Sequence, residues 1–140
     1  MIKSRGGVFG RNPTFNTVGI DNGLSVTGNL GLTEFTEGVV NVGTVVSSAT
    51  LSIASGTVLT ATLTASTACT FTMPTATAGK SFTLLLKQAA STGNGTATFT
   101  GVKWNAATPT MTATAGRMDI FTFVADGTNW YGSVLQNFTP

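Results

Sequence analysis

The side chains that could carry acid–base or metal chemistry are few and scattered in this sequence. There is no histidine, and the carboxylates are Asp21, Glu34, Glu37, Asp119 and Asp126. Catalysis needs several groups of tuned pKa in one pocket, and a structural metal site needs about four ligands. Glu34 and Glu37 lack a third partner, while Asp21 and Asp126 stand beside glycines at expected turns, where Asp is common for conformational reasons. The sequence therefore predicts no catalytic residue, metal site or cofactor.

Two further polar or reactive positions have structural interpretations. Asp119 and Arg117 flank the start of an expected strand, where we expect them to form a surface pair. Cys69 is the single cysteine. Cys69 lies on the same side of the alternating pattern as Phe71 and Met73, so we expect its side chain to be buried as a small hydrophobic group. A single cysteine allows no disulfide within the chain.

Three aromatic residues are candidates for ligand binding. Trp104, Trp130 and Tyr131 could form a platform for sugar rings or for a neighbouring chain, since aromatic rings provide a large apolar contact area. The alternation through 130–135 places one of the two adjacent rings inside and the other outside.

Composition narrows the class of protein. A chain of 140 residues has room for one domain and an extension. No charged residue occurs between Gly38 and Gly79, where Thr and Ser supply the polarity, and this composition favours strands packed in an assembly. The net charge of +2 is too small to indicate nucleic acid. With no apolar run typical of a signal or a membrane span, we expect a soluble protein made in a cytosol, without a membrane partner.

Residues 1–17 are interpreted as an arm, because Gly and Pro prevent regular structure there. A disordered tail and a docking arm that orders on a partner surface both fit this composition. The docking interpretation uses three cations and three apolar anchors: Lys3, Arg5, Arg11, Val8, Phe9 and Phe15.

Residues 18–37 contain three six-residue units, 18–23, 24–29 and 30–35. Apolar residues occupy the first and third places of each unit, and Gly and Asn supply turns at the end of the first two. Such short units become stable when neighbours stack or when several chains wrap round one axis. An ordinary pair of hairpins is the alternative to this shaft.

Residues 38–140 are predicted to form seven or eight strands connected by loops of moderate length. Period-2 alternation marks 80–87, and 118–125 is apolar enough to lie at the centre of a sheet. Asp126-Gly127 predicts a tight turn from 118–125 into a strand at 130–134. A clean alternation from 59 to 73 predicts one strand that ends at Pro74.

Two weaker signals complete the strand assignment. The apolar parity switches at Gly101 within 96–104, which predicts a β-bulge, and 110–114 is expected to form a short strand. With no helical period anywhere, we predict an all-β protein: an extended N-terminal arm, a short repeat shaft and an antiparallel β-sandwich or jelly-roll-like domain over 38–140.

The last third of the chain resembles a known family. Residues 76–88 (Ala-Thr-Ala-Gly-Lys-Ser-Phe-Thr-Leu-Leu-Leu-Lys-Gln), with Val102-Lys103-Trp104 and 119–132, are similar to a module of tailed-bacteriophage virion proteins, found in tail fibres and in capsid decoration or head-fibre proteins. Residues 5–15 are similar to the start of such proteins in phages of aquatic bacteria. Val39–Ala68 carries no resemblance. The resemblance implies a trimer with an N-terminal attachment segment and a distal β domain.

Three functions follow as expectations. The first is a non-enzymatic homotrimer in the virion, a capsid decoration, cement or head-fibre protein attached by residues 1–17 to the major capsid protein and assembled in the host cytoplasm. The second is a short tail fibre or adaptor that contacts the host receptor or other tail proteins. The third, from another class, is a carbohydrate-binding module that binds a host surface glycan through Trp104, Trp130 and Tyr131.

Overall fold

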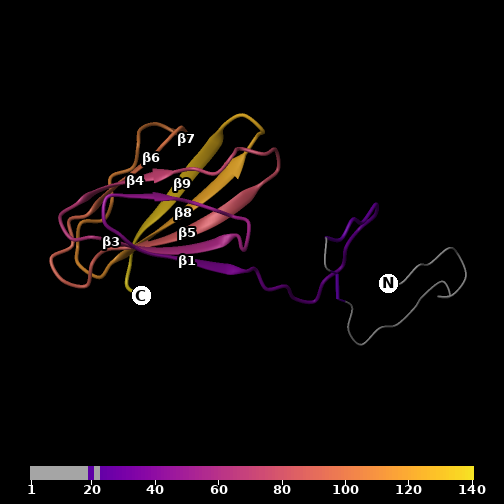
Figure 1. Cartoon of the computed structure of the whole chain (residues 1–140), viewed down its shortest axis with the longest axis horizontal. Helices are drawn as coiled ribbons and strands as arrows, with labels where there is room; N and C mark the ends of the chain where they lie inside the picture. The colour runs from indigo at the N-terminus through magenta and orange to yellow at the C-terminus, as the bar shows by residue number, and fades with distance from the viewer. Residues whose placement is uncertain (1–18, 21–22) are drawn as a thin grey trace, which may run out of the picture. The chain divides into compact units, whose positions relative to one another are not determined.

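The computed structural model describes residues 19–20 and 23–140 (Figure 1). The chain divides into two units, Met1–Phe35 and Thr36–Pro140. All regular secondary structure of the described residues belongs to the second unit, which is all-β and has no helix. This β domain is formed by nine strands: β1 (Val39–Val45), β2 (Ser48–Thr50), β3 (Val58–Leu63), β4 (Ala68–Thr72), β5 (Ser81–Lys87), β6 (Thr96–Phe99), β7 (Val102–Trp104), β8 (Met118–Ala125) and β9 (Trp130–Phe138).

The strands form two sheets, and the chain alternates between them from β1 to β7. The six-stranded sheet has the order β1-β3-β5-β8-β9-β7, and the three-stranded sheet has the order β2-β4-β6. Strands β1, β3 and β5 are parallel to one another, and so are β2, β4 and β6. Each coil of the domain consists of two consecutive strands, one in each sheet: β1 with β2, β3 with β4, and β5 with β6. These coils stack on one another, so the domain is β-solenoid-like.

The all-β class is confirmed, but the predicted antiparallel sandwich or jelly roll is wrong, because most strand pairs are parallel and only β5–β8 and β8–β9 are antiparallel. The continuous alternation from 59 to 73 belongs to two strands, β3 and β4, which lie in different sheets. The corner between them contains Ser66, whose φ is 50°. Leu59 and Phe71 keep the same parity because both sheets turn their inner faces to one core, so the alternation gives no sign of the corner.

Two local predictions fail at similar corners. Gly101 is not a bulge: with a φ of 73° it occupies the turn where the chain passes from β6 in one sheet to β7 in the other. Glycine accepts this left-handed conformation without a steric penalty. The segment 110–114 is irregular and pairs with no strand.

The predicted strands at 80–87 and 118–125 are confirmed as β5 and β8. Strand β8 lies inside the six-stranded sheet, antiparallel to both β5 and β9, and the turn at Asp126 connects β8 to β9. Figure 1 shows β5, β8 and β9 side by side. Only one face of β8 is buried, since Phe121 and Phe123 are inside while Val124 is exposed.

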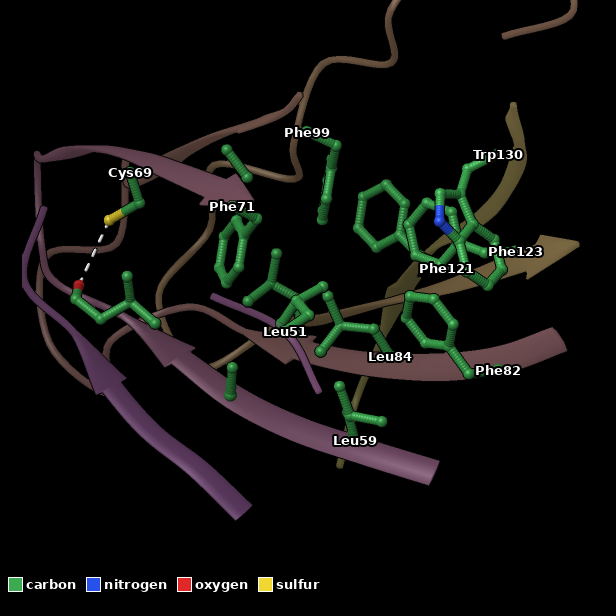
Figure 2. Packing of buried hydrophobic residues seen from close by; sticks show 14 of the residues in the cluster. Leu51, Leu59, Cys69, Phe71, Phe82, Leu84, Phe99, Phe121, Phe123 and Trp130 are labelled. Carbon is green, nitrogen blue, oxygen red and sulfur yellow. Dashed lines mark hydrogen bonds between the residues drawn. The ribbon is translucent and has the colours of Figure 1, made fainter. Parts of the chain in front are cut away.

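An aromatic cluster fills the space between the two sheets (Figure 2). The Phe82 and Phe123 rings stack with centroids 4.8 Å apart, and those of Phe71 and Phe99 stack at 5.1 Å. Cys69 is buried as predicted, and its Sγ donates to the carbonyl oxygen of Val45 at 3.2 Å. Because β4 and β5 belong to successive coils, this cluster holds the coils together.

Two glycines allow the first coils to approach each other closely. A Cβ added to Gly56 would lie 2.2 Å from the carbonyl oxygen of Gly38, which accepts a hydrogen bond from the Val58 N–H at 3.2 Å. The Thr57 hydroxyl donates to Glu37 beside this contact. Residues 37–38 therefore pack as part of the β domain, although the sequence placed 37 in the shaft.

Candidate assembly and binding surfaces

The described residues of the predicted shaft form no strand or helix and leave their apolar side chains uncovered. Phe35, for example, is 71% exposed. The exposed apolar residues of this segment are Ile20, Leu24, Val26, Leu30, Leu32 and Phe35. Most of them occupy the first and third places of the six-residue units, so one repeated pattern produces the apolar exposure. Soluble chains rarely leave such a run uncovered unless it meets a partner.

The predicted partner-binding residues of the arm lie outside the described part of the chain. They are Lys3, Arg5, Val8, Phe9, Arg11 and Phe15. Asp21, a predicted turn residue, lies outside it as well.

A second apolar surface lies on the outer face of the six-stranded sheet. Leu85, Ile120 and Leu135 are in register across β5, β8 and β9, and Leu135 is 66% exposed. Further outward-facing apolar residues are Val39, Val124, Tyr131 and Phe138. Among the strand residues of this described face, only Lys87 and Lys103 are charged. We call this the outer apolar face.

The three-stranded sheet has a different outer surface. Ser48, Thr70 and Thr98 are in register across β2, β4 and β6, and Thr50 pairs with Thr72. These side chains are small, hydroxylated and exposed, so they can form hydrogen bonds with water. The two outer surfaces of the domain therefore differ in chemistry, and only the outer apolar face has the character of an interface.

The three candidate aromatic residues do not form one platform. Trp130 is 3% exposed, packs edge-on against Phe82 and donates its indole N–H to the carbonyl oxygen of Pro74 at 2.7 Å. Tyr131 is 45% exposed on the opposite face of β9, as the alternation predicted. Trp104 is half-buried at the sheet edge, next to Gly132. Of the two tryptophans, only Trp104 reaches the surface.

Tyr131 instead belongs to the turn between β8 and β9. Its hydroxyl donates to Asp126 Oδ2 at 3.0 Å, and Asp126 Oδ1 accepts the backbone N–H groups of Asn129 and Thr128, each at 2.7 Å. These bonds, the one from Asn129 first, lower the pKa of Asp126, while the bond to Asp126 raises the pKa of Tyr131. The network closes a turn, the structural role expected for Asp126.

Trp104 lines a shallow groove of about 320 Å³. The groove lies between β9 and the segment that follows β7, and its lining consists of Trp104, Asn105, Ala106, Ala107, Pro109, Gly132, Ser133 and Val134. Asn105 and Ser133 are exposed polar residues of this lining. Sequence reasoning missed both, because a groove between β9 and an irregular segment leaves no periodic signal.

Asp119 is not part of a surface pair, so that prediction was wrong. The residue is 1% exposed and accepts hydrogen bonds from the Thr112 N–H at 2.8 Å, the Thr112 hydroxyl at 2.6 Å and the Asn137 N–H at 3.0 Å. Buried Gln88 donates to the carbonyl oxygens of Thr112 and Gly95, at 2.7 and 2.8 Å. Asp119 and Gln88 thus bind an irregular segment to the sheet. Arg117 donates to Thr139 instead.

The described residues hold no group of three His, Cys, Asp or Glu side chains placed to bind a metal ion. No described helix is long and apolar enough to cross a membrane. In comparisons with known proteins, no protein family, curated protein or solved structure matches this chain.

Proposed function

We propose that this protein is a non-enzymatic structural component of a tailed-bacteriophage virion, a homotrimer that decorates or cements the capsid or forms a short head fibre. Residues 1–17 attach it to the major capsid protein, residues 18–37 form the assembly segment, and the β domain points outward. The proposal includes a β-repeat shaft that forms only when three chains meet.

One observation carries the proposal: the periodic, uncovered apolar residues that precede a compact β domain. Leu24, Val26, Leu30 and Leu32 recur with the six-residue unit and are all exposed in the single chain. The β domain already has a closed aromatic core and does not need them. Three chains wound together would give these side chains a shared apolar interior.

The outer apolar face supports the same proposal. A sheet surface with Leu85, Ile120 and Leu135 in one row and lysines as its only charged strand residues resembles the apolar centre of an interface more than a solvated surface. Packing of this face in the trimer would extend the contact from the shaft to the β domain.

Light scattering of the full chain and of residues 36–140 tests the proposal. We expect a trimer for the full chain and a folded monomer for residues 36–140, because the shorter chain keeps the core and loses the shaft. A trimer in both cases would place assembly on the outer apolar face. A monomeric full chain would contradict the proposal.

The position in the virion is tested separately. A capsid decoration protein is present in many copies per particle, whereas a tail fibre or adaptor is present in few, so quantitative mass spectrometry of purified virions distinguishes them. We expect the high copy number, because a compact β domain carried on an attachment arm suits a repeated lattice.

A further inference from the structure

The groove beside Trp104 is a separate site with its own chemistry. We infer that it binds a neutral sugar ring, with the Trp104 indole as the apolar surface and Asn105 as the polar contact. This site lies within a single β domain. The inference therefore does not depend on the trimer or on the place of the protein in a virion.

The size and shape of the groove fit one or two sugar rings. Its volume of about 320 Å³ lies at the lower end of the range for small-molecule sites, about 300–1,000 Å³. It is shallow, with apolar walls from Ala106, Pro109 and Val134. A shallow groove suits a ligand that is contacted along one face and extends beyond the protein on the other.

The lining determines the charge of the ligand. None of the groove residues is ionisable. A charged ligand would lose its hydration without gaining an ion pair, which is costly. A neutral ligand avoids that cost, so uronic acids, sialic acids and phosphorylated compounds are disfavoured.

The polar and apolar parts of the lining match the two sides of a pyranose. One face of such a ring presents C–H groups, which pack on an aromatic surface, and hydroxyl groups project from its rim. The Asn105 amide offers two donors and an acceptor. The Ser133 side chain lies on the other face of β9, with Tyr131 and Leu135, so Ser133 lines the groove with its backbone. The Asn105 side chain is exposed, so it can exchange water for sugar hydroxyls.

The Trp104 ring is held in place before any ligand arrives. A Cβ at Gly132 would lie 2.5 Å from Trp104 Cζ3, so glycine is required for the ring to lie against β9. The indole also meets the core in edge-to-face contacts, with ring centroids 5.9 Å from Phe99 and 6.0 Å from Phe121. A fixed ring loses little conformational entropy on binding, which favours affinity.

The test uses the full chain and an array of neutral and acidic glycans, followed by NMR titration with the best neutral glycan. We expect binding of neutral glycans in the millimolar range, with amide shifts concentrated at Asn105 and Ser133. The Asn105→Ala variant should bind about tenfold more weakly, as expected for one or two lost hydrogen bonds. Ser48→Ala, an exposed serine on the three-stranded sheet, is the matched control and should bind like the original protein.

A Trp104→Ala variant would lose core packing as well as the sugar contact, so it cannot separate binding from stability. The decisive test is therefore a variant that fills the groove and leaves the core intact. Ala106→Trp should fill the groove and abolish binding while circular dichroism and the unfolding transition stay unchanged. Three results would each overturn the inference: no neutral glycan on the array binds, only acidic glycans bind, or the Ala106→Trp variant binds with unchanged affinity. So would selective binding of extended peptides along the β7 edge. The oligomeric state, measured on the same samples, tests the trimer independently.

Discussion

Asp126 and Tyr131 show how a turn residue acquires altered acid–base properties without a catalytic role. Both side chains are exposed, and the hydrogen bond between them lies at the surface rather than in a buried pocket. The lowered pKa of Asp126 makes its stabilising contribution complete above the ordinary value of 3.8, and this contribution is lost as the pH falls through the lowered pKa. The raised pKa of Tyr131 gives a contribution that is complete below 10.0 and is lost as the pH rises through the raised pKa. The turn is therefore most stable between these two values.

Replacing Asp126 with Asn should return the Tyr131 pKa toward its ordinary value of 10.0, because the negative acceptor that favours the protonated phenol is gone. The sequence has one tyrosine, so phenolate absorbance during an alkaline titration reports Tyr131 alone. Glu34→Gln removes a carboxylate elsewhere and serves as the control with matched charge. A titration midpoint that is equal in Asp126→Asn and the original protein would show that the bond does not form in solution.

At the scale of the elements, many strands were predictable, whereas most of their pairings, apart from the β8–β9 hairpin, were not. Strands β5 and β8 follow from alternating apolar residues bounded by turn residues, and Asp126-Gly127 correctly marked the turn into β9. Alternation reports only which side chains face a core. Leu59 and Phe71 face the same core from different sheets, so the sequence pattern runs through the corner near Ser66 without interruption. Parallel stacking of coils and antiparallel pairing of hairpins produce the same alternation of apolar and polar residues, so the pattern does not distinguish them.

The candidate sites were predictable to a similar degree. Trp104 could be named from its residue type, since an aromatic ring near a sheet edge often binds a ligand or packs on a core. Asn105 and Ser133 lie in the same groove because an irregular segment passes along β9, and no local signal predicts that path. Asp119 was assigned to the surface because its partners, Thr112 and Asn137, reach it only through the tertiary fold.

The Asp119→Asn substitution should loosen the segment that follows β7. An amide offers a single acceptor oxygen where the carboxylate accepts from Thr112 and Asn137 with both, so one buried N–H or hydroxyl loses its partner. We expect a loss of about 1–3 kcal/mol in the free energy of unfolding, measured by denaturant titration. Hydrogen exchange at the amides of Thr112 and Asn137 should accelerate. The exposed Asp126→Asn is the comparison, and an equal loss of stability in both variants would contradict a special role for the buried carboxylate.

For the whole molecule, the position of the assembly contact can be tested by placing a charge on each apolar surface in turn. Leu30→Lys should convert the trimer to monomers, because a lysine in a shared apolar interior loses its hydration without a partner. Sedimentation velocity measures the change. Thr98→Lys on the hydroxylated sheet surface is the control and should remain trimeric. If Leu135→Lys dissociates the trimer while Leu30→Lys does not, the outer apolar face holds the chains together in place of the shaft.

The parallel run of the first and last long strands also determines how the β domain bears mechanical force. Strands β1 and β9 point the same way, because β1 and β5 are both parallel to β3, β8 is antiparallel to β5, and β9 is antiparallel to β8. The chain therefore enters the domain at one end of the strand axis and leaves it at the other. Tension between an anchored N-terminus and the C-terminus acts along the strands, in shear. Shear loads the hydrogen bonds of a strand pair together, whereas peeling breaks them one after another, so this topology opposes extension along the direction in which an attached protein would be pulled.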